Sequence, residues 1–198
     1  MYNKEYLFFS SLKEFRSNAF NPSGRLDNKE LNTKNEQLTS LSATIGSKTI
    51  HFHKMKDFRG QYMEYLEQPK INCCSLHWLE IEQGFPPTTY DERLIEMGEK
   101  TILIYDLSKF FEILGKSIQL LGYDFHREKV RYYDSGNYNG DLTLHRKDIR
   151  YEYQNEYRIL IYPTNNNPIK IPLKGLKEIS AVVETSKLKN MKIETKKN

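Results

Sequence analysis

Cysteine is scarce in this chain of 198 residues, which contains only the neighbours Cys73 and Cys74. Adjacent cysteines do not easily bridge each other, and two of them alone form no metal-ligand spacing set. The sequence therefore predicts a domain that is held together by its hydrophobic core, without disulfides or metal, and that suits a reducing compartment.

Long apolar runs are absent as well. No segment approaches the roughly 18 apolar residues of a membrane span, and charged residues follow the N-terminus too soon for a signal peptide. We therefore expect a cytoplasmic protein without membrane contacts. The chain also lacks a glycine-rich phosphate loop, a Gly-x-Ser-x-Gly motif and a Cys-x-x-Cys motif, so kinase-like, Rossmann, hydrolase and zinc-site classes have no support.

The net charge of +4 is not spread over the chain. Residues 187–198 contain five lysines and one glutamate, while the remaining residues contain 25 basic and 25 acidic side chains. We predict one globular domain over residues 1–186 and a lysine-rich tail over 187–198. Such a tail is typical of a solvated terminus or of an electrostatic arm for nucleic acid or an acidic partner.

The composition, with 13% aromatic and 28% charged residues, is that of a globular protein. Apolar and β-branched runs predict strands over 5–12, 70–81, 100–107, 128–134, 155–163, 167–173 and 178–185. We expect 100–107 to be a fully buried strand and 42–55 to form a hairpin around Gly46 and Ser47.

Helical spacing is clearest over 108–125, where an apolar stripe lies between a predicted N-cap at Ser108 and a stop at Gly122. Shorter helices are predicted within 11–20, 56–69 and 82–100, and a loop or poorly packed helix over 21–40. The fold class that follows is α+β, with a mostly antiparallel sheet or two small packed sheets and helices.

The segment over 150–163, RYEYQNEYRILIYP, places polar residues on a core-like strand. Because alternate side chains of a strand share a face, Gln154, Glu156 and Arg158 should line one side, before the strand becomes apolar. This pattern fits a strand that begins beside a cleft. The alternative is a set of cross-strand ion pairs on a solvent-facing sheet.

Gln154-Asn155-Glu156, followed by Ile159-Leu160-Ile161, resembles the Gln/Glu-x-Glu strand of ADP-ribosyltransferases, including bacterial toxin members. The same segment is similar to an uncharacterised bacterial family in which a Glu-x-Glu-Tyr-Arg strand follows an earlier Cys-Phe-Ser strand. Cys73-Cys74-Ser75 stands where that earlier strand is expected. It departs from the Ser-Thr-Ser strand of the transferases, of which only Ser75 has a match.

The resemblance implies an NAD-dependent mono-ADP-ribosyltransferase, in which NAD is a substrate and no metal is expected. Glu156 would be the catalytic glutamate that stabilises the oxocarbenium ion, and Gln154 would orient the acceptor. Ser75, Tyr153 and Arg158 would belong to the NAD pocket.

The resemblance also implies an Arg or His on the first strand that grips NAD. Arg16 is preferred because it follows the first predicted strand; the others eligible by order are Arg59, His51 and His53. His51 and His53 share a strand face at a spacing that could also ligate a metal, but no further ligands complete a site.

The resemblance also implies that the loop before the Glu156 strand meets the acceptor, and Tyr151, Arg146 and Lys147 lie in that loop. Such aromatic and basic groups suit nucleic acid, and a protein acceptor is equally open. The alternative is that the tyrosines pack on an edge strand under solvated basic residues. The resemblance suggests a bacterial toxin or phage-defence effector, with an antitoxin or chaperone as partner.

Two alternatives to a transferase remain. The first is a non-catalytic interaction module with a basic tail. The second is a nuclease, which would need a metal-binding acidic cluster; Asp141, Asp148, Glu152 and Glu156 have no recognisable spacing for one.

Overall fold

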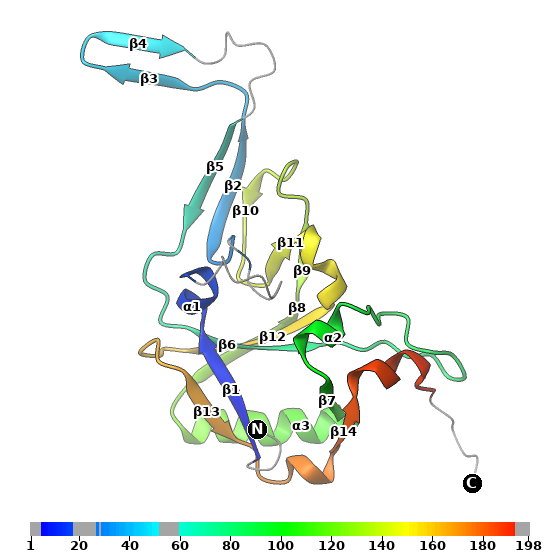
Figure 1. Ribbon diagram of the computed structural model, residues 1–198. Helices are drawn as coiled ribbons and strands as arrows, with labels where there is room; N and C mark the ends of the chain where they lie inside the picture. Colours follow the sequence, from blue (N-terminus) through cyan, green and yellow to red (C-terminus); the bar gives the residue numbers. More distant parts are fainter. Residues whose placement is uncertain (1–4, 18–26, 28, 52–59, 193–198) are drawn as a thin grey trace.

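The computed structural model describes residues 5–17, 27, 29–51 and 60–192 (Figure 1). It confirms an α+β fold with mostly antiparallel, small sheets and few helices. The largest sheet has five strands in the order β13-β1-β6-β12-β8. Their bounds are Ile169–Pro172, Tyr6–Ser11, Asn72–His77, Glu156–Tyr162 and Asp124–Lys129.

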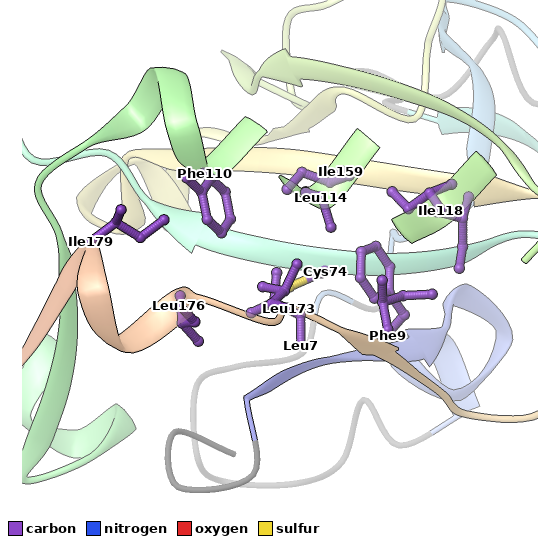
Figure 2. Close-up of a cluster of buried hydrophobic side chains, with 12 residues drawn as sticks. Leu7, Phe9, Cys74, Phe110, Leu114, Ile118, Ile159, Leu173, Leu176 and Ile179 are labelled. Atoms are coloured by element: carbon purple, nitrogen blue, oxygen red, sulfur yellow. The ribbon is translucent and has the colours of Figure 1, made fainter. Parts of the chain in front are cut away.

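One face of this sheet carries the main core. Helix α3, Leu107–Leu120, lies along it and directs Phe110, Leu114 and Ile118 at strand residues such as Phe9 and Ile159 (Figures 1 and 2). The apolar stripe predicted on this helix is therefore confirmed for these three helix residues. The N-cap differs from the prediction: Asp106 caps the helix and its side chain accepts from Lys109 N, because the helix begins before Ser108.

The opposite face carries the polar residues of the central strands. Glu156, Arg158 and Leu160 of β12 lie across from His77, Ser75 and Cys73 of β6, and directly paired residues of an antiparallel ladder share a face. Leu160 and Cys73 pack in a second, smaller cluster with Leu12. Helix α1, Leu12–Ser17, follows β1 directly.

A second sheet joins β10, β2 and β5, with bounds Gly140–Asp141, Asn32–Leu38 and Gly60–Tyr65. The loop or helix predicted over 21–40 and the helix predicted over 56–69 are wrong where these strands lie. Neither strand has an alternating apolar face, and β2 is held instead by polar contacts. The buried Asn35 amide, for example, donates to the Tyr138 carbonyl over 2.7 Å.

The predicted hairpin is confirmed. Strands β3, Ser42–Ile45, and β4, Lys48–His51, pair around Gly46, whose φ of 60° favours glycine. The hairpin stands at the far end of the β2–β5 pair, away from the central sheet (Figure 1).

Strand β7, Lys100–Ile104, pairs with β14, Ser180–Glu184, in a separate two-stranded sheet. The strand predicted over 100–107 is present over 100–104. It is not fully buried: Lys100 is exposed and the other residues are half-buried, and one side of the strand borders a cavity. The short helix α2, Leu94–Met97, precedes it.

Strands β9, Arg131–Tyr133, and β11, Arg146–Asp148, pair in parallel, and the 3-10 helix η3, Ile149–Gln154, leads from β11 into β12. Two further 3-10 helices are η4, Leu176–Glu178, and η5, Thr185–Asn190. The predicted tail boundary at residue 187 falls inside η5, where Leu188 is buried; residues 193–198 lie outside the described part. No helix of the described residues is long and apolar enough to cross a membrane.

Candidate functional site

A cavity of about 450 Å³ opens where β1 and β6 separate. The two strands pair only at Ser10 with Cys73 and at Ser11 with Asn72, whereas the preceding residues of β1, 6–9, pair with β13. Strand β7 and helix α2 contribute to its lining. The cavity is lined by apolar side chains, among them Leu7, Phe8, Leu12, Met97, Ile102, Ile104 and Leu176. Its volume lies within the usual range of ligand sites.

A carboxylate lies among polar partners at this cavity. Glu156, the first residue of β12, is 3% exposed. Ser75 Oγ donates to Glu156 Oε1 over 2.5 Å, and Ser75 is itself exposed toward the cavity that both residues line. Lys147 Nζ lies 2.9 Å from Glu156 Oε2. The two residues that the sequence singled out, Ser75 and Glu156, are thus in direct contact.

Arg158 completes the cluster from the same strand. Its Nε donates to Glu156 Oε1 over 2.8 Å, and its NH1 donates to Glu30 Oε1 over 2.7 Å and to the carbonyl of Leu144. Arg158 and Glu30 are buried, so two cations and two carboxylates balance one another out of water. The alternative of solvent-facing ion pairs is wrong: the pairs exist, but they are buried.

Sequence reasoning missed Glu30. It lies 128 residues before Arg158 in a segment without periodicity, and only the folded chain brings the two together. No local signal could have found it.

Gln154 belongs to the same cluster, but it does not lie on the strand as the sequence predicted. It is the last residue of η3 and not part of the strand, because Asn155 adopts a left-handed conformation with φ of 36°. Its side chain is buried and lines the cavity, and its Oε1 accepts from Lys147 Nζ over 2.7 Å. Gln154 and Glu156 therefore share one lysine.

The cluster keeps Glu156 ionised. Burial alone would raise the pKa of Glu156, but Arg158, Lys147 and the hydrogen bond from Ser75 outweigh it and hold that pKa far below the ordinary value. Burial raises the pKa of Glu30, whose attraction to Arg158 does not offset the lost hydration. Of the two carboxylates, Glu156 is thus the one whose ionised form the site favours.

The sulfur atoms beside the cavity are not nucleophiles. Burial raises the pKa of Cys73 to about 12 and also raises the pKa of Cys74. Both are free thiols, and reactivity requires the thiolate.

The remaining predicted residues are not all gathered at the cavity. The Tyr153 ring lies 3.7 Å from the Arg93 guanidinium, and its hydroxyl accepts from Gln154 Nε2 over 3.3 Å, so it flanks the site without lining the cavity. The Tyr151 ring lies 5.0 Å from Lys147 Nζ. Arg146 stacks over Tyr138 and does not line the cavity.

Lys147, predicted to meet the acceptor, is 4% exposed, bound to Glu156 and Gln154, and among the residues that line the cavity. Of the residues expected to grip NAD, Arg16 belongs to α1 but its side chain lies outside the described part, as do Arg59 and His53. His51 lies in the distant hairpin, where its Nδ1 is 2.8 Å from Ser42 Oγ.

In comparisons with known proteins, no family model, no curated protein and no solved structure matches this chain.

Proposed function

We propose that the protein is an NAD-dependent mono-ADP-ribosyltransferase whose fold is of the ADP-ribosyltransferase kind. The observation that carries the proposal is the contact of Ser75 with Glu156, 2.5 Å between Oγ and Oε1, beside a cavity of about 450 Å³. The resemblance requires these two residues to meet, although they stand 81 positions apart in the sequence.

The order of the strands supports the same function. The resemblance involves three segments: a first strand, the strand of Ser75 and the strand of Glu156. These are β1, β6 and β12, which are adjacent in the central sheet. The apolar walls suit a planar nicotinamide ring, and the exposed Lys100 among the lining residues suits the pyrophosphate.

The proposed reaction uses Glu156 as an electrostatic group. The bond between nicotinamide nitrogen and ribose carbon breaks, its electron pair leaves with neutral nicotinamide, and positive charge develops on the ribose. A fixed anion stabilises that charge. The acceptor nucleophile, from a nucleic acid or a protein, then bonds to the same carbon and releases its proton to solvent.

Gln154 is placed to act on the acceptor. Its amide oxygen is held by Lys147, and its amide nitrogen lies on the side of Tyr153. Such a held amide can orient a nucleophile without changing its charge. Tyr151 and Tyr153, on η3, offer aromatic surface beside it.

One observation favours a second candidate, a non-catalytic interaction module. Both carboxylate oxygens of Glu156 already have protein partners, and the described charges of the cluster balance, as in a structural network. The two candidates differ in whether the protein binds NAD and turns it over.

The test is transfer of label from NAD carrying a labelled ADP-ribose group to cell-extract acceptors by the wild type and by Glu156→Gln. We expect the variant to lose about 100-fold or more of the activity, because the anion facing the cation is removed. Glu152→Gln is the matched control, since Glu152 is exposed on η3, four residues before Glu156; it should transfer like the wild type.

Glu156→Gln leaves Arg158 and Lys147 short of a counter-charge, so its fold needs a check by circular dichroism and urea unfolding. Ser75→Ala keeps all four charges and removes only the hydroxyl that fixes Glu156. We expect it to fold and to transfer more slowly. Full activity in both variants would rule out the assignment.

A further inference from the structure

Three side chains with metal-binding atoms meet outside the cavity. His126 and Glu128 lie two apart on β8, so they share a face, and His145 from the segment before β11 packs against them. One ligand atom of each lies within 4.8 Å of the others. His126 Nε2 and Glu128 Oε2 are 3.7 Å apart, and the two imidazole rings meet edge to face at 4.9 Å between centroids.

Of the three residues, His145 gives the strongest indication of a bound ligand. It is 5% exposed, and its Nε2 has no hydrogen-bond partner among the described residues. A buried polar atom without a partner costs free energy, so it calls for an explanation. The ring also hydrogen-bonds to the backbone of Arg158, which leaves Nε2 as the nitrogen directed away from that contact.

This arrangement matches what a metal-bound histidine needs. A ligating histidine usually donates its second ring nitrogen to a carbonyl or carboxylate, which fixes the ring orientation. The Arg158 backbone supplies that contact, and Arg158 is itself held by two carboxylates. The His145 imidazole is therefore held in one orientation, whereas the side chains of His126 and Glu128 are partly exposed and can rotate.

We propose that His126, Glu128 and His145 form a site for a divalent transition metal of the zinc class. Two imidazole nitrogens and one carboxylate oxygen are a ligand set that Zn²⁺ accepts, with water in the fourth position. This site goes beyond the proposed transferase activity and does not depend on it. It differs from the expectation, drawn from the sequence, that no metal is involved.

To bind a zinc ion, the three ligand atoms would have to move closer together than they are in the structure. Tetrahedral zinc with bonds near 2.0 Å sets its ligand atoms roughly 3.3 Å apart. His126 and Glu128 have side chains that are 58% and 39% exposed, so rotation of these two can close the site on the fixed His145. Arg131 NH2 lies 3.0 Å from Glu128 Oε1, which leaves Oε2 on the side of His126.

A metal ion would give His145 Nε2 the partner that this buried atom lacks among the described residues. Of the described residues, these three are the group whose ligand atoms could hold an ion.

The experiment is calorimetric titration of ZnCl2 into full-length protein that has been stripped with a chelator. We expect one equivalent to bind in the wild type, and His126→Ala and Glu128→Gln to weaken that binding by about tenfold or more. Both changes fall on partly exposed side chains, so the variants should keep the wild-type urea midpoint.

His51→Ala is the control, because His51 is the described histidine of the other candidate spacing and lies in the distant hairpin. The His51→Ala variant should bind zinc as tightly as the wild type does. Absence of zinc binding by the wild type, unchanged binding in His126→Ala or Glu128→Gln, or loss of binding in His51→Ala would each overturn the proposal.

Discussion

At the scale of single residues, Asp148 holds in place the segment that leads into the site. Its Oδ2 accepts from Ser135 and its Oδ1 from the Arg150 side chain over 2.8 Å, and it also accepts from Arg150 N at the start of η3. Because η3 ends at Gln154, this buried carboxylate fixes the segment that delivers Gln154 and Glu156. Asp148 therefore positions this segment, and it is not among the residues that line the cavity.

Asp148 should also make the fold sensitive to acid. Burial opposes its charge, but the hydrogen bonds from Arg150 and Ser135 lower the pKa of Asp148 from 3.8 to about 2. A carboxyl with a depressed pKa stabilises the fold fully above its unfolded value and loses that contribution as pH falls toward the folded value.

We expect Asp148 to account for about 2 kcal/mol of unfolding free energy that disappears between pH 4 and pH 2. Urea unfolding at several pH values measures it: the slope against pH should be smaller in Asp148→Asn than in the wild type. Asp141→Asn, at an exposed position, should keep the wild-type slope. Equal slopes in Asp148→Asn and the wild type would contradict the account.

At the scale of elements, helix α3 supplies Phe110, Leu114 and Ile118 to the main core on one face of the central sheet. Leu114 is fully buried in the main core, while Leu120 on the same helix is 87% exposed. The same residue type therefore stands in two environments on one element.

Leu114→Ala should lower the unfolding free energy by about 2–5 kcal/mol, because it removes buried methyl groups and leaves a cavity. Leu120→Ala should change it by no more than about 0.5 kcal/mol. Urea denaturation of both variants measures the contrast. A comparable loss in the two would show that α3 does not pack as described.

The elements also show what a sequence can predict. Helix α3, strand β12 and the β3–β4 hairpin were predicted because apolar spacing and Gly46 mark them. Strands β2 and β5 were missed because their partners are polar: Asn35 is fully buried, yet an asparagine carries no strand signal. Hydrogen bonds to carbonyls 100 and 103 residues away are invisible to periodicity.

At the scale of the whole molecule, the candidate site combines chain segments that lie far apart in the sequence. Ser75 and Glu156 could be named from the resemblance, and the fold brings them together. Glu30 could not be named, and the burial of Lys147 and Arg158 could not be foreseen, because burial is a property of the folded chain. The sequence singled out the pair Ser75 and Glu156, and the structure added the charges that hold it.

The measurement that tests the central claim most directly is calorimetric titration of NAD into the wild type and into Ile102→Trp. Ile102 is half-buried on β7 and lines the cavity, so a tryptophan there occupies the proposed dinucleotide site. Ile95→Trp, on an exposed position of α2 that does not line the cavity, is the control. We predict that NAD binds to the wild type and to Ile95→Trp and about tenfold or more weakly to Ile102→Trp. Absence of binding by the wild type at millimolar NAD, or equal binding by Ile102→Trp, would contradict the account.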